Sequence, residues 1–109
     1  MIVSGYRTMW IMVMFDLPTD SKEARRIYSR FRKSLKEDGF MMLQFSVYGR
    51  ACPSEENLDV HIKRVKQKLP PEGQVRVLSF TDKQFARMQI FAGKKRLKTE
   101  DSTVQLEFF

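Results

Sequence analysis

Residues 9–15 are apolar at every position, so a strand here has two hydrophobic faces. One face would carry Trp10, Met12 and Met14, and the other Ile11, Val13 and Phe15. A strand without a polar face is normally covered on both sides. A chain of 109 residues has little material for a second covering layer, so we expect a partner chain to contact Trp10, Met12 and Met14.

The remaining segments alternate between helical and strand patterns. Apolar residues at helical spacing predict a helix that starts with a capping box of Asp20 and Glu23 and stops near Gly39. A second helix should begin at Pro53-Ser54, with an apolar stripe ending at Leu69. Alternation predicts strand structure in 40–50, as one bent strand or two strands joined near Gly49, and further strands at 75–80 and 104–108, with a turn at 81–83 and a weaker strand at 85–91.

This order of elements predicts an α+β fold, a ferredoxin-like βαββαβ sandwich with two helices on one face of an antiparallel sheet and an extra C-terminal strand. The sheet face without helices would be bare, which favours a homodimer formed through it. We divide the chain into a flexible leader at 1–8, the ferredoxin-like domain at 9–91, and a basic linker with the terminal strand at 92–109.

The net charge of the chain narrows the classes of function that the protein can have. The net charge is +7 and the isoelectric point is near 9.8, a balance that favours nucleic acid ahead of a membrane as the partner. One cysteine and one histidine exclude a disulfide framework and a zinc site built from one chain. No apolar run is long enough to span a membrane and no signal-peptide pattern is present, so we expect a cytoplasmic protein without a membrane partner.

Asp16 ends the apolar strand, where aspartate is uncommon. A carboxylate at the exit of a central strand can help to hold Mg²⁺, and two copies across a dimer axis would make a better site for hydrolysis of a phosphodiester. A plain strand-to-loop turn is the commoner reason for an aspartate at this position. Both interpretations stay open on position alone.

Two groups of bases are candidates for binding the DNA backbone. The first predicted helix carries Lys22, Arg25, Arg26, Arg30 and Lys33. The second group, between Lys83 and Lys98, contains six bases and no acid, including Arg87, Lys94, Lys95 and Arg96. A solvated helix face usually mixes both signs of charge, so the second group favours phosphate contacts.

The other polar candidates are weaker. His61 is spaced with Leu58 and Val65 as a residue at the edge of the core. Ser46 should make a cross-strand hydrogen bond, and Cys52 should be structural.

Three runs, 12–20, 44–48 and 83–88, together resemble the second core CRISPR-associated protein, the small adaptation subunit, and in particular its type II versions. The resemblance implies a homodimer that bridges dimers of the CRISPR integrase, the first core Cas protein, and captures double-stranded DNA for insertion into the repeat array. It also implies that Asp16 is the metal-associated acid for which the family is described as a Mg²⁺-dependent nuclease. The strand containing Val104, Leu106 and Phe108 would make the dimer or partner contact.

Two hypotheses follow, a DNA-binding scaffold without chemistry of its own and a Mg²⁺-dependent endonuclease using Asp16 from both protomers. We favour the scaffold because nuclease sites usually gather several acids. A single-stranded RNA binder of the RRM type would share the fold outline, but the strand candidate at 74–80 lacks the aromatic pattern that stacks bases.

Overall fold

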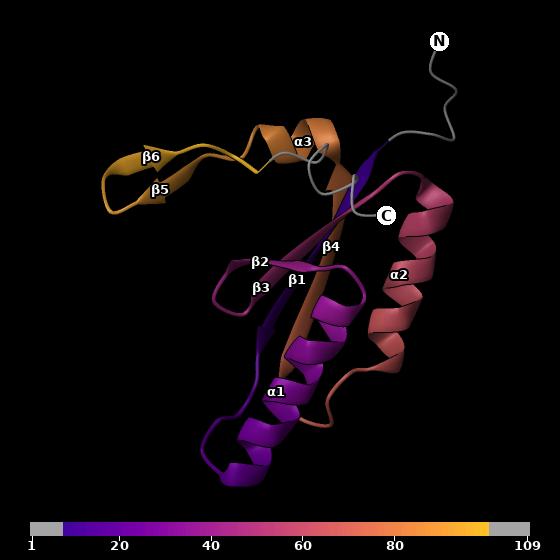
Figure 1. Ribbon diagram of the computed structural model, residues 1–109, viewed down its shortest axis with the longest axis vertical. Helices are drawn as coiled ribbons and strands as arrows, with labels where there is room; N and C mark the ends of the chain where they lie inside the picture. Colours follow the sequence, from indigo (N-terminus) through magenta and orange to yellow (C-terminus); the bar gives the residue numbers. More distant parts are fainter. Residues whose placement is uncertain (1–7, 101–109) are drawn as a thin grey trace.

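The computed structural model describes residues 8–100 (Figure 1). Residues 1–7 of the predicted leader and the predicted strand at 104–108 lie outside this range. The elements in chain order are β1 (Met9–Asp16), α1 (Lys22–Glu37), β2 (Met41–Gln44), β3 (Val47–Cys52), α2 (Glu55–Gln67), β4 (Gln74–Thr81), α3 (Asp82–Ala86), β5 (Ile90–Ala92) and β6 (Lys95–Leu97).

The main sheet has the strand order β2-β3-β1-β4, and its paired strands are all antiparallel. β1 lies inside the sheet and pairs with β3 on one side and β4 on the other. Helices α1 and α2 lie on the same side of this sheet (Figure 1). This arrangement confirms the ferredoxin-like α+β fold.

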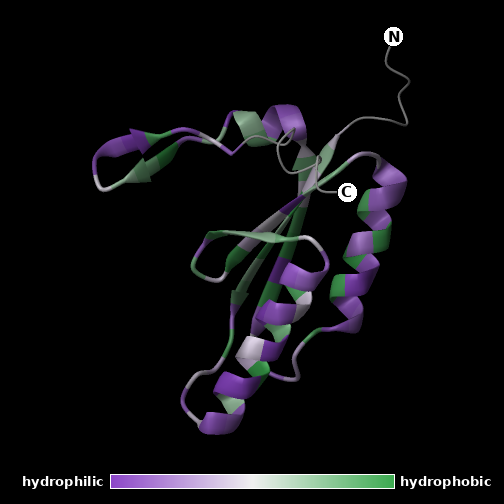
Figure 2. Ribbon diagram, in the orientation of Figure 1, coloured by the Kyte–Doolittle hydropathy of each residue, from purple (hydrophilic) through white to green (hydrophobic). Residues whose placement is uncertain are grey.

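The main core lies between the sheet and the two long helices. Ile11, Val13 and Phe15 point from β1 into this core and are buried. Phe31 of α1 meets Phe15 edge-on, with ring centroids 5.1 Å apart. In Figure 2, both helices alternate hydrophobic and hydrophilic stretches, as amphipathic surface helices do.

A second, smaller cluster covers the start of β1 on the opposite face. The Trp10 ring is fully buried, lies 3.8 Å from the Phe85 ring of α3, and donates a hydrogen bond of 2.8 Å from Nε1 to Asp82 Oδ1. The prediction that Trp10 contacts a partner is therefore wrong. The short helix α3 covers the Trp10 ring with the ring of Phe85. Met12 and Met14 remain half-buried, and Leu78 of β4, which pairs with Met12, is 50% exposed.

The start of α1 and the junction between β2 and β3 differ from the sequence prediction. Ser21, rather than Asp20, caps α1, and its hydroxyl accepts a 3.0 Å hydrogen bond from the Ala24 amide. The segment after α1 forms two strands, but they are joined at Phe45-Ser46 rather than near Gly49. Ser46 adopts a positive φ of 59° in this turn. Gly49 lies inside β3, where a Cβ would come within 2.8 Å of the Leu43 side chain.

The segment after β4 differs most from the sequence prediction. The expected turn at 81–83 is the start of α3, where Thr81 and Gln84 form a capping box. Phe85 is therefore helical, and the expected strand at 85–91 is wrong except at its end. Part of the expected linker forms the β5–β6 hairpin around Gly93, which has a φ of 61°. Leu69 lies beyond the end of α2 and is 48% exposed.

Within residues 8–100, no helix has the length and apolar character needed to cross a membrane.

Candidate nucleic-acid interface and strand-end carboxylate

Asp16 is the last residue of β1, it is exposed, and it pairs in register with Gln74. Side chains alternate along a strand, so Asp16 is on the same sheet face as Met12 and Met14. The loop before β4 passes close to this strand end. A Cβ on Gly73, whose φ is +89°, would lie 2.6 Å from the Asp16 carbonyl oxygen. The strand end can be approached this closely only by a glycine.

The β2–β3 turn braces the other flank of the strand end. The Phe15 amide donates a 3.0 Å hydrogen bond to the Ser46 carbonyl. The Ser46 hydroxyl lies 2.8 Å from the Tyr28 hydroxyl on α1. Ser46 thus bonds to a helix, and the predicted cross-strand bond is wrong because Ser46 is in the turn. Phe45, which is 79% exposed, stacks on Tyr28.

The donor set at this end fits part of a Mg²⁺ site. Magnesium typically takes one or two protein carboxylates and completes its shell with water and phosphate oxygens. Asp16 supplies one such carboxylate. Asp20 is also exposed, and it is free of the capping role that the sequence suggested. Among residues 8–100, no three histidine, cysteine, aspartate or glutamate side chains gather into a metal-binding group.

The bases predicted on the first helix lie on α1 and are exposed: Lys22, Arg25, Arg26, Arg30 and Lys33. Arg26 pairs with Glu23 at 3.3 Å, and Arg25 Nη1 donates to the Thr19 carbonyl at 3.1 Å. The structure gives the other three no ion-pair partner among the residues it describes. Their charge is available to an anionic partner.

The second basic group lies elsewhere. Arg87 follows α3 directly, while Lys94, Lys95 and Arg96 occupy the turn and second strand of the β5–β6 hairpin, and all four are exposed. The hairpin extends away from α1 and α2 (Figure 1). The predicted DNA-binding residues therefore form two separate surfaces.

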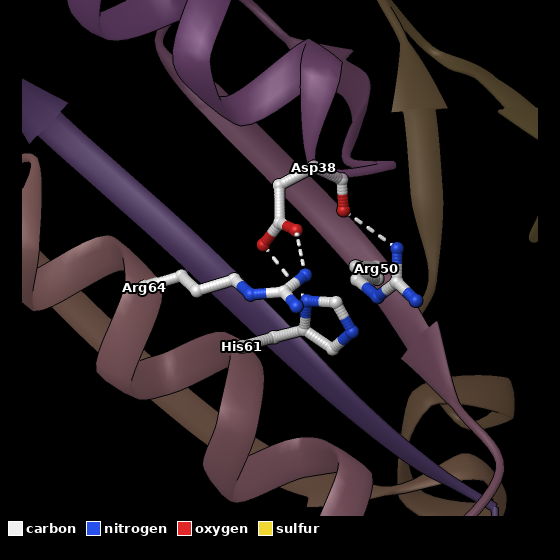
Figure 3. A network of polar contacts seen from close by, with 4 residues as sticks. All are labelled: Asp38, Arg50, His61 and Arg64. Carbon is white, nitrogen blue, oxygen red and sulfur yellow. Dashed lines mark hydrogen bonds and ion pairs between the residues drawn. The ribbon is translucent and has the colours of Figure 1, made fainter.

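Four polar side chains that the sequence does not link form a partly buried network (Figure 3). Asp38, the C-cap of α1, lies 2.8 Å from His61 Nδ1 and accepts a 2.8 Å hydrogen bond from Arg64 Nη1. Arg50 Nη1 of β3 donates to the Asp38 carbonyl at 2.6 Å. The network joins α1, α2 and β3. The sequence identifies Asp38 only as part of the predicted helix end at Asp38-Gly39. No spacing in the sequence links Arg50, His61 or Arg64 to it.

Burial shifts two side-chain pKa values in this region. It lowers the pKa of His61, with the nearby Arg50 charge adding to this effect and the hydrogen bond to Asp38 opposing it. Burial also raises the pKa of the Cys52 thiol, partly offset by Arg50. His61 is 5% exposed and Cys52 is fully buried, which confirms a core-edge histidine and a structural cysteine.

The fold and these surfaces define a small ferredoxin-like α+β protein with a strand-end carboxylate and two exposed basic surfaces. Residues 9–88 match the model of the family described as CRISPR associated protein Cas2. The chain belongs to this Cas2 family.

Similar proteins support this assignment. The chain is 54% identical over 101 residues to a CRISPR-associated endoribonuclease Cas2 of Parvibaculum lavamentivorans, covering 93% of this chain and 100% of the relative. It is 51% identical over 107 residues to the Flavobacterium psychrophilum protein of that name, covering 98% and 93% of the two chains. A solved structure described as a crystal structure of Cas2 superposes with a TM-score of 0.55 at 20% identity, over 86% of this chain and 99% of the other.

Proposed function

We propose that this protein is a homodimeric DNA-binding scaffold of CRISPR adaptation, which bridges dimers of the integrase while new spacers are captured and inserted. The observation that carries this proposal is the set of exposed cations on α1 and on the β5–β6 hairpin that lack carboxylate partners among residues 8–100. Such cations suit a phosphate backbone and need no base-specific contact.

The sheet face opposite α1 and α2, which residues 8–100 leave partly uncovered, supports the dimer. Met12 and Met14 are half-buried and Leu78 is half-exposed on the side opposite α1 and α2. The outer side of β4 also has no strand partner among the described residues. A free strand edge is a ready site for pairing with another chain. Val104, Leu106 and Phe108 are proposed for this partner contact.

A Mg²⁺-dependent endonuclease is the second candidate. The exposed carboxylate of Asp16 favours it, as does the name endoribonuclease carried by the relatives. A second copy packed on the uncovered face would bring another Asp16 from the same face of its own β1. Bound Mg²⁺ would supply Lewis-acid stabilisation and a more acidic water, and the two Asp16 carboxylates would hold the ion.

Replacing Asp16 separates the two functions. We expect Asp16→Ala, purified with the integrase partner, to insert a DNA duplex into a repeat array at close to the wild-type rate. Asp59→Ala, which removes an exposed acid on α2, is the matched control. Loss of insertion by Asp16→Ala alone, with the dimer and the complex intact by size-exclusion chromatography, would instead support a catalytic role.

A further inference from the structure

The sheet face opposite α1 and α2 is apolar along most of its length. Met12, Met14 and Asp16 lie on this face of β1. Residues that pair directly across two strands share a face, so Leu78 and Arg76 of β4, which pair with the two methionines, lie there as well. Among the described strand residues on this face, only Asp16 and Arg76 are charged.

The two charged residues lie at the end of this face away from α3. Asp16 pairs in register with Gln74. Arg76, two residues further along β4, is therefore the diagonal neighbour of Asp16. The short helix α3 packs at the other end, against Trp10 near the start of β1. Asp16 and Arg76 are both exposed, so a second surface can reach them without moving α3.

Neither charge is neutralised within the described part of the chain. Asp16 and Arg76 form no ion pair with each other or with any other residue among 8–100. Asp38 at the end of α1, in contrast, is paired with Arg64. Opposite charges at neighbouring positions of a sheet stabilise it when they pair. Here both charged groups remain available to a partner that approaches this face.

One negative and one positive group make this face complementary to a second copy of itself. In a symmetric homodimer, residue i of one copy contacts residue j of the other, and j contacts i. Two copies aligned so that each Asp16 meets the partner's Arg76 would form two equal ion pairs. A shift along β1 would set each charge against apolar residues such as Met12 or Leu78, and burying a charge without a partner is costly.

We propose that Asp16 and Arg76 form reciprocal ion pairs between two copies of this chain and fix how the copies are aligned. This inference rests on the homodimer of the proposed function. It gives Asp16 a role that needs no chemistry, because an arginine guanidinium can hold a carboxylate without a metal. The partner's Arg76 and a Mg²⁺ ion would compete for the same carboxylate.

The test reverses each charge separately in the full-length chain. Asp16→Arg places two positive groups in each contact, and Arg76→Asp places two negative groups there. Sedimentation velocity measures the dissociation constant of the dimer, and circular dichroism verifies folding. Native mass spectrometry counts homodimers and heterodimers in an equal mixture of the two variants. The matched controls, Asp59→Arg and Lys63→Asp, make the same charge changes at exposed positions on α2.

We expect each single reversal to raise the dissociation constant at least about tenfold, because like charges then face each other twice in the dimer. Mixing Asp16→Arg with Arg76→Asp should restore association, since both contacts of the heterodimer again join opposite charges. Each chain of that heterodimer still carries two like charges, so a pair within one chain would not be restored. The α2 variants should dimerise like the wild type, both alone and mixed, which measures the effect of overall charge.

Three outcomes would overturn the ion pairs and leave the dimer standing. The single reversals may dimerise as tightly as the wild type. A chain carrying both reversals may recover while the mixture does not, which would place the pair within one chain. EDTA may dissociate the wild-type dimer, which would show a metal bridging the two Asp16 carboxylates. A wild type that is monomeric at every concentration would instead reject the homodimer of the proposed function.

Neutral variants keep the test decisive if a reversed charge prevents folding. Asp16→Asn and Arg76→Gln should each weaken the dimer, because each leaves one charge without its partner. A chain with both changes should dimerise at least as tightly as either single variant, whereas additive losses would reject the pair. The insertion assay with Asp16→Ala is run well above the dissociation constant of that variant, where the dimer forms.

Discussion

At the scale of single residues, the clearest feature is the histidine held beneath the end of α1. His61 has an aspartate at 2.8 Å and two arginines in the same network, yet burial keeps its pKa below the usual value of 6.5. A neutral His61 donates from Nδ1 to Asp38 and leaves both arginine charges to balance one carboxylate. Protonation of His61 would place a third positive charge beside buried Arg50 and exposed Arg64.

This arrangement predicts a loss of stability in mild acid. Because the pKa of His61 is lower in the folded chain than in the unfolded chain, the unfolded state binds more protons as the pH falls below about 6.5. The free energy of unfolding should therefore fall from pH 7.5 to pH 5.5, by at most about 1.4 kcal/mol per pH unit from this residue. Urea denaturation at several pH values measures it.

His61→Gln provides the control. It cannot titrate in this range, so its stability should vary less with pH than that of the wild type, even if it is less stable overall. A wild type and a variant with parallel pH profiles would contradict the assignment of the effect to His61.

At the scale of elements, the sequence predicted the long segments well and the short ones poorly. β1, α1, α2 and β4 carry periodic apolar patterns that extend over whole elements, and these four were predicted correctly to within a few residues. α3 has five residues and β5 and β6 have three each, too few for a period to be visible. The one sequence signal for α3 is local, and it is the capping box that Thr81 and Gln84 form at its start.

The same distinction applies to the candidate site. Asp16 and the basic residues of α1 were found because their positions relative to a periodic element are visible in the sequence. The covering of Trp10 by Phe85 was not, because the two residues are far apart in the chain and meet only when α3 folds onto β1. Tertiary contacts of this kind have no sequence period.

The cap of α1 offers a direct test of a corrected boundary. Ser21→Ala removes the hydroxyl that accepts from the Ala24 amide and should lower the free energy of unfolding by about 1 kcal/mol. Asp20→Ala is the matched control and should change it by less than about 0.5 kcal/mol, as expected for an exposed residue outside the cap. Urea denaturation compares the two, and a larger loss for Asp20→Ala would restore the original capping prediction.

At the scale of the whole molecule, the sheet is covered unequally. Among the described residues, α1 and α2 cover one face, whereas on the other face α3 covers only the start of β1. The half-exposed residues on that face, including Leu78, lie beyond the reach of this short helix. Within residues 8–100, the helices therefore cover one face of the sheet fully and the other only in part.

Leu78 tests the proposed dimer. A charge at this position would be buried without a partner in an apolar interface, at a cost of several kcal/mol per protomer. We expect Leu78→Glu to sediment as a monomer at micromolar concentrations at which the wild type sediments as a dimer. Val60→Glu changes a similarly exposed apolar residue on α2 and should leave the dimer intact. A dimeric Leu78→Glu variant would place the contact elsewhere.

The stacking of Phe85 on Trp10 has a consequence for symmetry. It seals the end of the sheet where β1 begins and leaves open the end where Asp16 lies. In the proposed dimer, a twofold axis through this face would pass nearer the open end, because the two α3 helices would otherwise meet at the sealed ends. The two carboxylates would sit close to the axis and the two hairpins far from it, so one small aromatic pair would set the span of the assembled dimer.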